Sequence, residues 1–289
     1  MKKVQTRPEK LYPSDVSRKQ FEVIRPLLDS ARKKTSPHTV DRHLIFNAVL
    51  YLLREGCRWR ALPKDYPDWN LCYYYYRVWR DHIDEDSGLP LLELVLSTLV
   101  AQDRIGDARA EQTTFLILDS QSVKNTAPAQ EKGYDGGKKV SGIKRHVAVD
   151  SRGLPHGLLV TTANVSDKAG AKAMLAQCAP RLSSVKKVLV DGGYEGEPFA
   201  QSVQELLGAE VEVAKRNELS PFALIPKRWV VERTLSWLET CRRLWKNCER
   251  KLSSSLAMMG LAFIVLLLRR LSPGSERWPT KPTGASARP

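Results

Sequence analysis

The stretch Phe115-Leu116-Ile117-Leu118-Asp119 predicts a buried strand that ends on a carboxylate, and the polar run Ser120-Gln121-Ser122-Val123-Lys124 follows it. Four consecutive apolar residues are typical of a strand that is covered on both faces. Burying the charge of Asp119 costs several kcal/mol unless a cation, a metal ion or hydrogen-bond donors compensate it. We therefore expect a compensating group beside Asp119.

A second apolar run ends in the same way, at Lys186-Lys187-Val188-Leu189-Val190-Asp191, and Gly192-Gly193-Tyr194 then turns the chain. If the two strands are adjacent and parallel, both aspartates emerge at the carboxyl ends of the strands, where ligands bind to open α/β sheets.

A helix that begins near Pro226 carries a third carboxylate, Glu232, with Arg228 one turn before it. An apolar stripe on this helix is predicted to face the sheet, with Glu232 at its polar edge. The stripe consists of Val231, Leu235, Leu238 and Trp245, and Val230, Trp237 and Leu244 widen it.

Three carboxylates on separate elements predict a metal site. Acidic groups that face one another repel, and divalent ions remove the repulsion. Oxygen ligands favour Mg²⁺, with Mn²⁺ as the second choice, and a pair of such ions stabilises displacement at phosphorus. Taken singly, each acid also has a structural interpretation: either aspartate can cap a strand or form an ion pair, and Glu232 can pair with Arg228.

The composition favours a polyanionic partner. Lys and Arg number 46 against 32 Asp and Glu, which gives a net charge of +14 in a chain that is 42% apolar. Such an excess is typical of proteins that bind nucleic acid or an anionic membrane, although it also occurs in generically basic soluble proteins. The basic residues that we expect to contact the polyanion are Arg58, Arg60, Arg77, Arg80, Lys124, Lys138, Lys139, Lys144, Arg145, Lys215, Arg216, Lys227, Arg228, Arg233, Arg242 and Arg243.

No membrane span or secretory signal is expected. The longest apolar run, from Leu256 to Leu268, is interrupted by Gly260 and predicts a buried helix rather than a span. The basic N-terminus is not followed by an apolar segment, so we expect a cytoplasmic protein. The five cysteines are scattered, without the spacing of a zinc site.

The order of the predicted elements suggests a helical part followed by an α/β part. Helices are expected near residues 14–28, 41–55, 69–80 and 90–104, and the first three resemble a helix-turn-helix unit. Half of the tyrosines in Tyr73-Tyr74-Tyr75-Tyr76 should pack in the core, and the outward ones, beside Arg77 and Arg80, are candidates for DNA contact. A hairpin is predicted over 145–161, helices over 166–178 and 197–207, a strand over 211–214, and closing helices over 226–247 and 253–271.

Several motifs in this order resemble bacterial DDE transposases of the insertion-sequence-five family. The resemblance extends from about Tyr12 to Leu271. It rests on Tyr12-Pro13-Ser14-Asp15, the run from Ala48 to Pro63, the aromatic helix from Tyr73, the run from Leu118 to Lys124, Gly136-Gly137-Lys138-Lys139, Lys144-Arg145-His146, Asp191-Gly192-Gly193-Tyr194 and Trp229-Val230-Val231-Glu232-Arg233.

This resemblance implies an α/β fold with a ribonuclease H-like mixed sheet flanked by helices, preceded by an all-α, helix-turn-helix-like domain. It implies that residues 1–110 bind DNA ends, that 111–271 form the catalytic domain with Asp119, Asp191 and Glu232 as metal ligands, and that 272–289 form a mobile tail. The implied reaction is metal-dependent cleavage and strand transfer of double-stranded DNA, at terminal inverted repeats and at a target. The implied protein is a homodimer or higher multimer associated with the nucleoid.

One departure concerns the glutamate motif. The family pattern is Tyr, two residues, Arg, three residues, Glu, six residues, Lys, whereas this chain has Ile225 at the Tyr position and Glu239 at the Lys position. Arg242 or Arg243, one turn further on, can replace the missing lysine.

Two other functions fit the same residues. A ribonuclease H-like nuclease without strand transfer would need the same acids and metals. A DNA-binding regulator would use only the N-terminal helices, with a degenerate catalytic half.

Overall fold

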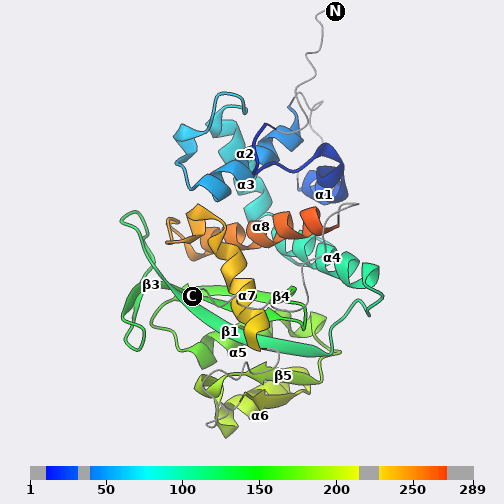
Figure 1. The fold of residues 1–289 in the computed structure, drawn as a ribbon, viewed down its shortest axis with the longest axis vertical. Coiled ribbons are helices and arrows are strands. Elements are labelled where there is room, and N and C mark those ends of the chain that lie inside the picture. Colours follow the sequence, from blue (N-terminus) through cyan, green and yellow to red (C-terminus); the bar gives the residue numbers. More distant parts are fainter. Residues whose placement is uncertain (1–10, 32–39, 215–227, 272–289) are drawn as a thin grey trace, which may run out of the picture.

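The computed structural model describes residues 11–31, 40–214 and 228–271. A mixed sheet lies under a layer of helices, and Figure 1 shows both parts. The central strand is β1 (Phe115–Lys124), which pairs antiparallel with β3 (Val140–Val149). The outer edge of β3 is shared by β2 (Gly133–Asp135) and β4 (Pro155–Thr162), both antiparallel to it. On the other side of β1, β5 (Lys187–Val190) and β6 (Glu210–Val213) are parallel.

This arrangement confirms the predicted ribonuclease H-like mixed sheet. Three antiparallel strands in chain order, β1, β3 and β4, are followed by two parallel strands on the opposite side of β1. The hairpin predicted over 145–161 is β3 and β4. It turns at Ser151-Arg152-Gly153, and Gly153 has the positive φ of 83° that such a turn requires.

Helices cover both faces of the sheet. Leu116 and Leu118 of β1 pack with helices α5 (Asp167–Cys178) and α6 (Glu197–Leu207) on one face. Ile117 of β1 and Leu189 of β5 belong to the core on the other face, together with α7 (Arg228–Glu239). Because successive strand residues point to opposite faces, odd-numbered residues in the first half of β1 face α7.

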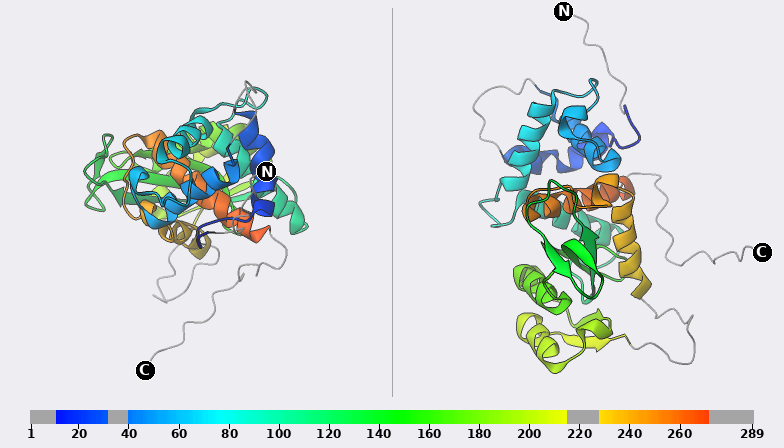
Figure 2. Two further views of the ribbon diagram at one scale, coloured as in Figure 1. Left: turned by 90° about the horizontal axis from the view of Figure 1, so that it is seen from above. Right: turned by 90° about the vertical axis from the view of Figure 1, so that its left-hand side faces the viewer.

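The remaining helices are α1 (Arg18–Ser30), α2 (Arg42–Glu55), α3 (Trp69–Asp81), α4 (Leu91–Gly106) and α8 (Leu252–Arg270). Although α8 follows the sheet in sequence, it packs against all four N-terminal helices and also against β4 (Figure 2). One continuous apolar core therefore joins the helical part to the α7 face of the sheet. Short 3₁₀ helices lie at Trp59–Ala61, Ala179–Arg181, Gly192–Tyr194 and Arg242–Leu244.

Capping side chains and a left-handed glycine mark the ends of several helices. Ser17 caps α1 in a capping box with Gln20. Gly56 ends α2 in the left-handed conformation, with φ 71°. Ser166 caps α5 by accepting a hydrogen bond from the amide of Ala169.

Two expected boundaries are wrong. The first strand does not end at Asp119, because β1 continues to Lys124 along its antiparallel partner β3. The helix expected over 226–247 ends at Glu239, and Asn247 instead pairs with the end of β1. Trp245, assigned to the buried stripe, consequently lies beyond α7 and is 60% exposed.

Helix α8 is long and apolar enough, by length and composition alone, to cross a membrane, a test that buried core helices also pass. In the fold, 67% of its apolar window is buried, so the predicted buried helix is confirmed.

Candidate functional site

Asp119 and Asp191 lie on neighbouring parallel strands and at equivalent positions. Ile117 of β1 is paired with Leu189 of β5. Asp119 lies two residues after Ile117, and Asp191 lies two residues after Leu189. Residues two apart on a strand point to the same face, so both carboxylates belong to the face that α7 covers. The condition set out from the sequence, that the two strands are adjacent and parallel, is met.

The backbone at each aspartate holds the side chain in a defined orientation. Asp119 Oδ1 accepts a hydrogen bond from the amide of Ser120 at 2.7 Å, and Asp191 Oδ1 accepts one from the amide of Gly193 at 3.0 Å. Asp191 thereby caps the short helix Gly192–Tyr194. Both carboxylates are partly exposed.

Helix α7 brings Glu232 over the same face. Its buried residues Val230, Val231, Leu235 and Leu238 pack toward the sheet, whereas Glu232 is exposed. Glu239, two turns after Glu232, accepts a hydrogen bond from Gln121 of β1 at 3.3 Å. Since residues seven apart share a helix face, Glu232 and Glu239 are on the same face of α7.

The helix and the strand run in roughly the same direction, because Thr234 contacts the carbonyl of Gly153 near the start of β1 and Glu239 contacts Gln121 further along. Going back from Glu239 to Glu232 covers about 10 Å of helix, and going back from Gln121 to Asp119 covers about 7 Å of strand. These lengths set Glu232 back along α7 and Asp119 back along β1 by similar distances from the Glu239–Gln121 contact. Across residues 11–31, 40–214 and 228–271, however, no group of three or more Asp, Glu, His or Cys side chains is arranged to hold a metal ion.

A buried ionic network lies on the opposite face, directly behind the aspartates. Lys144 Nζ is 2.8 Å from Asp167 Oδ1 and 3.2 Å from Asp135 Oδ2, and it donates to the carbonyl of Val165 at 2.8 Å. Burial lowers the pKa of Lys144, but the hydrogen bond and charge of Asp167 outweigh it, so the pKa is raised overall. Lys144 therefore stays charged and ties β3 to the start of α5.

Tyr194 and Ser120 complete this network. Tyr194 is 2% exposed, and burial followed by the charges of Asp167 and Asp119 raises its pKa far above the usual range. The Ser120 hydroxyl interacts with both the Tyr194 hydroxyl and the Asp167 carboxylate. Ser120 follows Asp119 directly and Tyr194 lies three residues after Asp191, so the network contains a residue close in sequence to each aspartate. The sequence showed the Asp-Gly-Gly-Tyr motif but not the buried role of its tyrosine.

Three of the predicted DNA-contacting residues are buried and engaged with the protein, which corrects their assignment. Lys144 belongs to the network just described. Arg145 is 3% exposed and donates to Gln121 Oε1 at 3.3 Å and to the carbonyl of Leu244 at 2.8 Å. Arg243 is 8% exposed, with Glu249 at 2.6 Å and the carbonyl of Cys57 at 2.9 Å. The basic strand and helix patterns could not distinguish these from surface residues.

Two other predicted contacts are half-buried. Arg80 pairs with Asp81 at 2.6 Å and donates to Ser254 Oγ. Arg233 lies over the rings of Trp229 and Trp237 and donates to the carbonyl of Arg152 at 2.8 Å. The exposed members of the set are Arg58, Arg60, Arg77, Lys124, Lys138, Lys139 and Arg242. Lys215, Arg216, Lys227, Ile225 and the side chain of Arg228 lie outside the described residues, as does the predicted tail.

The aromatic helix α3 divides as expected. Tyr75 and Tyr76 are buried, Tyr73 is half-buried, and Tyr74 is 46% exposed. Arg77 is exposed on the same stretch of helix and lies over the ring of Tyr73. An exposed tyrosine and arginine therefore remain available on the helical part.

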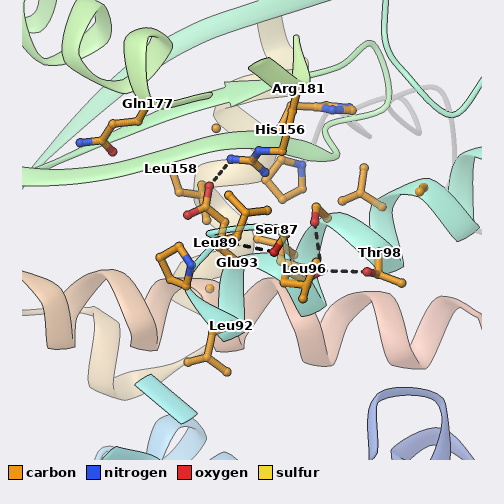
Figure 3. A pocket seen from close by; sticks show the side chains of 18 of the residues that line it. Ser87, Leu89, Leu92, Glu93, Leu96, Thr98, His156, Leu158, Gln177 and Arg181 are labelled. Carbon is orange, nitrogen blue, oxygen red and sulfur yellow. Dashed lines mark hydrogen bonds and ion pairs between the residues drawn. The ribbon is translucent and has the colours of Figure 1, made fainter. Parts of the chain in front are cut away.

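A cavity of about 940 Å³ lies away from the carboxylates, between α4, α8 and β4. Figure 3 shows its apolar walls, with Leu92, Leu96 and Leu158, and the ion pair between Glu93 and Arg181. Asp119, Asp191 and Glu232 are not part of its lining. Mostly apolar walls suit neither a phosphate chain nor a divalent ion, so the exposed carboxylate face is the candidate site.

Comparison with known proteins gives consistent matches. A model of the transposase DDE domain matches residues 110–268, and a model described as a putative transposase of the IS4/5 family matches residues 16–83. A putative transposase for insertion sequence element IS402 from Burkholderia cepacia is 32% identical over 117 residues, which cover 38% of this chain and 55% of that protein. The chain thus matches about half the length of this relative.

Among solved structures, the Mos1 mariner paired end complex with Mn has a TM-score of 0.28 and 11% identity, covering 87% of this chain and 85% of that one. A score this low carries no argument about the fold, which rests on the strand order described above.

Proposed function

We propose that this chain, which belongs to the transposase DDE domain family, is an insertion-sequence transposase that cleaves DNA at the ends of its element and joins those ends to a target. The observation that carries the proposal is the pairing of Ile117 with Leu189, since it brings the carboxylates of Asp119 and Asp191 to one face of the sheet. Glu232, on the helix that covers this face, is the proposed third ligand.

Divalent metal dependence follows from the family, and Mg²⁺ is the ion that we propose, with Mn²⁺ able to replace it. Carboxylate oxygens on two adjacent strands suit such hard cations, and the exposure of Glu232 allows its side chain to approach them. When bound, the ions would neutralise charge at the phosphate and activate the attacking oxygen.

The protein groups around the site have separate proposed tasks. Asp119 and Asp191 would hold the ions, and the buried network of Lys144, Asp167 and Tyr194 would support the sheet behind them. Gln121 and Glu239 fasten α7 to β1, which limits how far Glu232 can move. Because Glu239 accepts a hydrogen bond from Gln121, we propose that it does not contact phosphate and that Arg242 serves instead.

For the remaining parts we propose that residues 1–110 bind the terminal inverted repeats, with Tyr74 and Arg77 among the contacts, that 111–271 catalyse, and that 272–289 form a tail. Two ends must be brought together, so the active form would be at least a dimer. The proposed location is the cytoplasm, on the nucleoid.

The test compares Asp119→Ala, Asp191→Ala and Glu232→Ala with the wild type and with a control, Glu205→Ala, on the exposed side of α6. The three site variants should bind end DNA but fail to cut it in Mg²⁺, while the control cuts normally. If any site variant cuts at the wild-type rate, that ligand assignment is wrong. Cleavage without strand-transfer products would indicate a nuclease, and end binding without any cleavage would indicate a regulator.

A further inference from the structure

Two segments that are far apart in the sequence meet beside the far end of β1. Asn247, in the loop between α7 and α8, donates from its amide to the carbonyl of Lys124 at 2.9 Å and accepts from the amide of Thr126 at 2.9 Å. The amide of Gln130 donates to the carbonyl of Arg250 at 3.3 Å. In Figure 1 this loop lies beside the end of the long β1–β3 ribbon. We call residues 124–141 and 245–251 together the ribbon–loop surface.

The ribbon–loop surface carries an excess of exposed positive charge. Its acidic residues are engaged: Glu131 accepts from the amide of Leu252 at 2.7 Å, Glu249 pairs with Arg243 at 2.6 Å, and Asp135 pairs with Lys144 at 3.2 Å. In contrast, six exposed basic residues make no ion pair within the described part of the chain. They are Lys124, Lys132, Lys139, Lys246, Arg250 and Lys251.

Two aromatic side chains stand among these charges. Trp245 is 60% exposed and Tyr134 is 58% exposed, so neither contributes much to the apolar core. The indole nitrogen of Trp245 donates a hydrogen bond to the carbonyl of Glu239 at the end of α7. This bond gives the ring a fixed attachment while most of its surface stays in water. An exposed tryptophan with a fixed orientation suits the stacking of a planar ligand.

The surface is continuous with the carboxylate site. Arg145 bonds both to Gln121 of β1 and to the carbonyl of Leu244, the residue before Trp245. Gln121 follows Asp119 by two residues on the same face, a spacing of about 7 Å. On β2, Tyr134 is paired with Ser141, which shares a face of β3 with Arg145. Both aromatic residues therefore belong to the side of the sheet that carries Asp119.

We propose that the ribbon–loop surface binds unpaired DNA next to the carboxylate site, with Trp245 stacking on a base and Tyr134 as a second, weaker platform. Proteins that bind single strands combine a positively charged track with aromatic side chains, because every base has a face that can stack. The inference rests on the proposed function only in supposing that the strand at the carboxylates is DNA.

The test measures binding of a fluorescein-labelled oligothymidylate by anisotropy, in EDTA, so that no cleavage is needed. Trp245→Ala should weaken binding about tenfold and Tyr134→Ala less, whereas Trp245→Phe, which keeps a ring, should bind nearly as well as the wild type. Lys172→Ala, an exposed lysine on α5 and the other face of the sheet, is the charge control and should bind normally.

The same variants are then measured on a long two-stranded blunt duplex, whose bases are paired and stacked and therefore offer the ring little to stack on. Trp245→Ala should change this affinity less than twofold. The proposal is overturned if Trp245→Ala binds oligothymidylate as tightly as the wild type does, or if its affinity falls by the same factor for both DNAs. Should Trp245→Ala fail to fold, Trp245→Leu replaces it, and equal binding by the Leu and Phe variants overturns stacking. A protein that binds in this assay but never cuts DNA would contradict the proposed function and leave this inference intact.

Discussion

Ile117 of β1 is paired in parallel with Leu189 of β5, so that Asp119 and Asp191, two residues further on, share one face of the sheet. Two like charges at neighbouring positions repel each other, and a divalent ion converts that repulsion into attraction to a common ligand. The first prediction follows from this relationship.

Mn²⁺ should raise the midpoint of thermal unfolding of the wild type, because an ion that binds only the folded state stabilises it by about 2.7 kcal/mol at one hundred times its dissociation constant. Asp119→Asn and Asp191→Asn should lose this rise, since each removes one of the charges that attract the ion. Differential scanning fluorimetry with and without Mn²⁺ measures it. Glu205→Gln on α6 is the control, and a full rise in either site variant would contradict the assignment.

Two helical glycines should respond to alanine in opposite directions. A Cβ added to Gly170 in α5 would lie 2.0 Å from His146 Cε1, whereas one added to Gly260 in α8 has no atom within 4 Å. We expect Gly170→Ala to lower the free energy of unfolding by about 2 kcal/mol through overpacking. Gly260→Ala should raise it by about 0.5–1 kcal/mol, because alanine is the better helix former. Urea denaturation measures both, and equal shifts would show that α5 is not packed on His146.

The free energy of unfolding should decrease as the pH is lowered, on account of His146, which is fully buried. Burial lowers its pKa to about 4, despite the opposing charge of Asp167. The unfolded state, with an ordinary pKa near 6.5, therefore binds a proton first as the pH falls. Stability is complete above about pH 6.5 and is lost progressively toward pH 4, by about 3 kcal/mol.

His146→Gln removes the titrating group and should flatten this part of the profile. Urea denaturation of both proteins across that pH range gives the comparison. A variant profile that stays parallel to the wild type would assign the loss to other groups.

Lys144 and Lys124 should have different consequences when neutralised, although both are lysines on the long ribbon. Lys144→Met should lower the free energy of unfolding by about 3 kcal/mol, because it leaves Asp135 and Asp167 without their shared cation. Lys124→Ala should leave stability nearly unchanged, since the side chain is exposed. It should instead reduce the salt dependence of DNA binding, lowering the steepness of the plot of log binding constant against log salt concentration by about one.

Urea denaturation and fluorescence anisotropy at several salt concentrations separate the two effects. If Lys144→Met folds as stably as the wild type and reduces the salt dependence, the buried ionic network has been assigned wrongly.

The sequence by itself determined most of the helices and strands and the positions of the candidate metal ligands along them. Apolar runs before Asp119 and Asp191 identified two buried strands, and helical spacing placed Val231, Leu235 and Leu238 in a buried stripe. These features depend on neighbours in the chain, so local periodicity was sufficient to find them. A parallel relation of the two strands was the condition under which both aspartates would lie where ligands bind to such sheets.

Only the tertiary structure decided which charges and aromatic rings reach the surface. Lys144 and Arg145 carry charges that are typical of surface residues but are buried in the fold, because β3 is covered on both faces and carboxylates or carbonyls on other elements meet their charges. Trp245 had the helical spacing of a core residue, yet it is exposed in the fold. Helix α7 ends at Glu239, and the chain after it leaves the helix so that Asn247 pairs with Asn125 at the end of β1. Contacts between segments that are distant in the sequence leave no periodic signal in either segment, and packing overrides local preference at such positions.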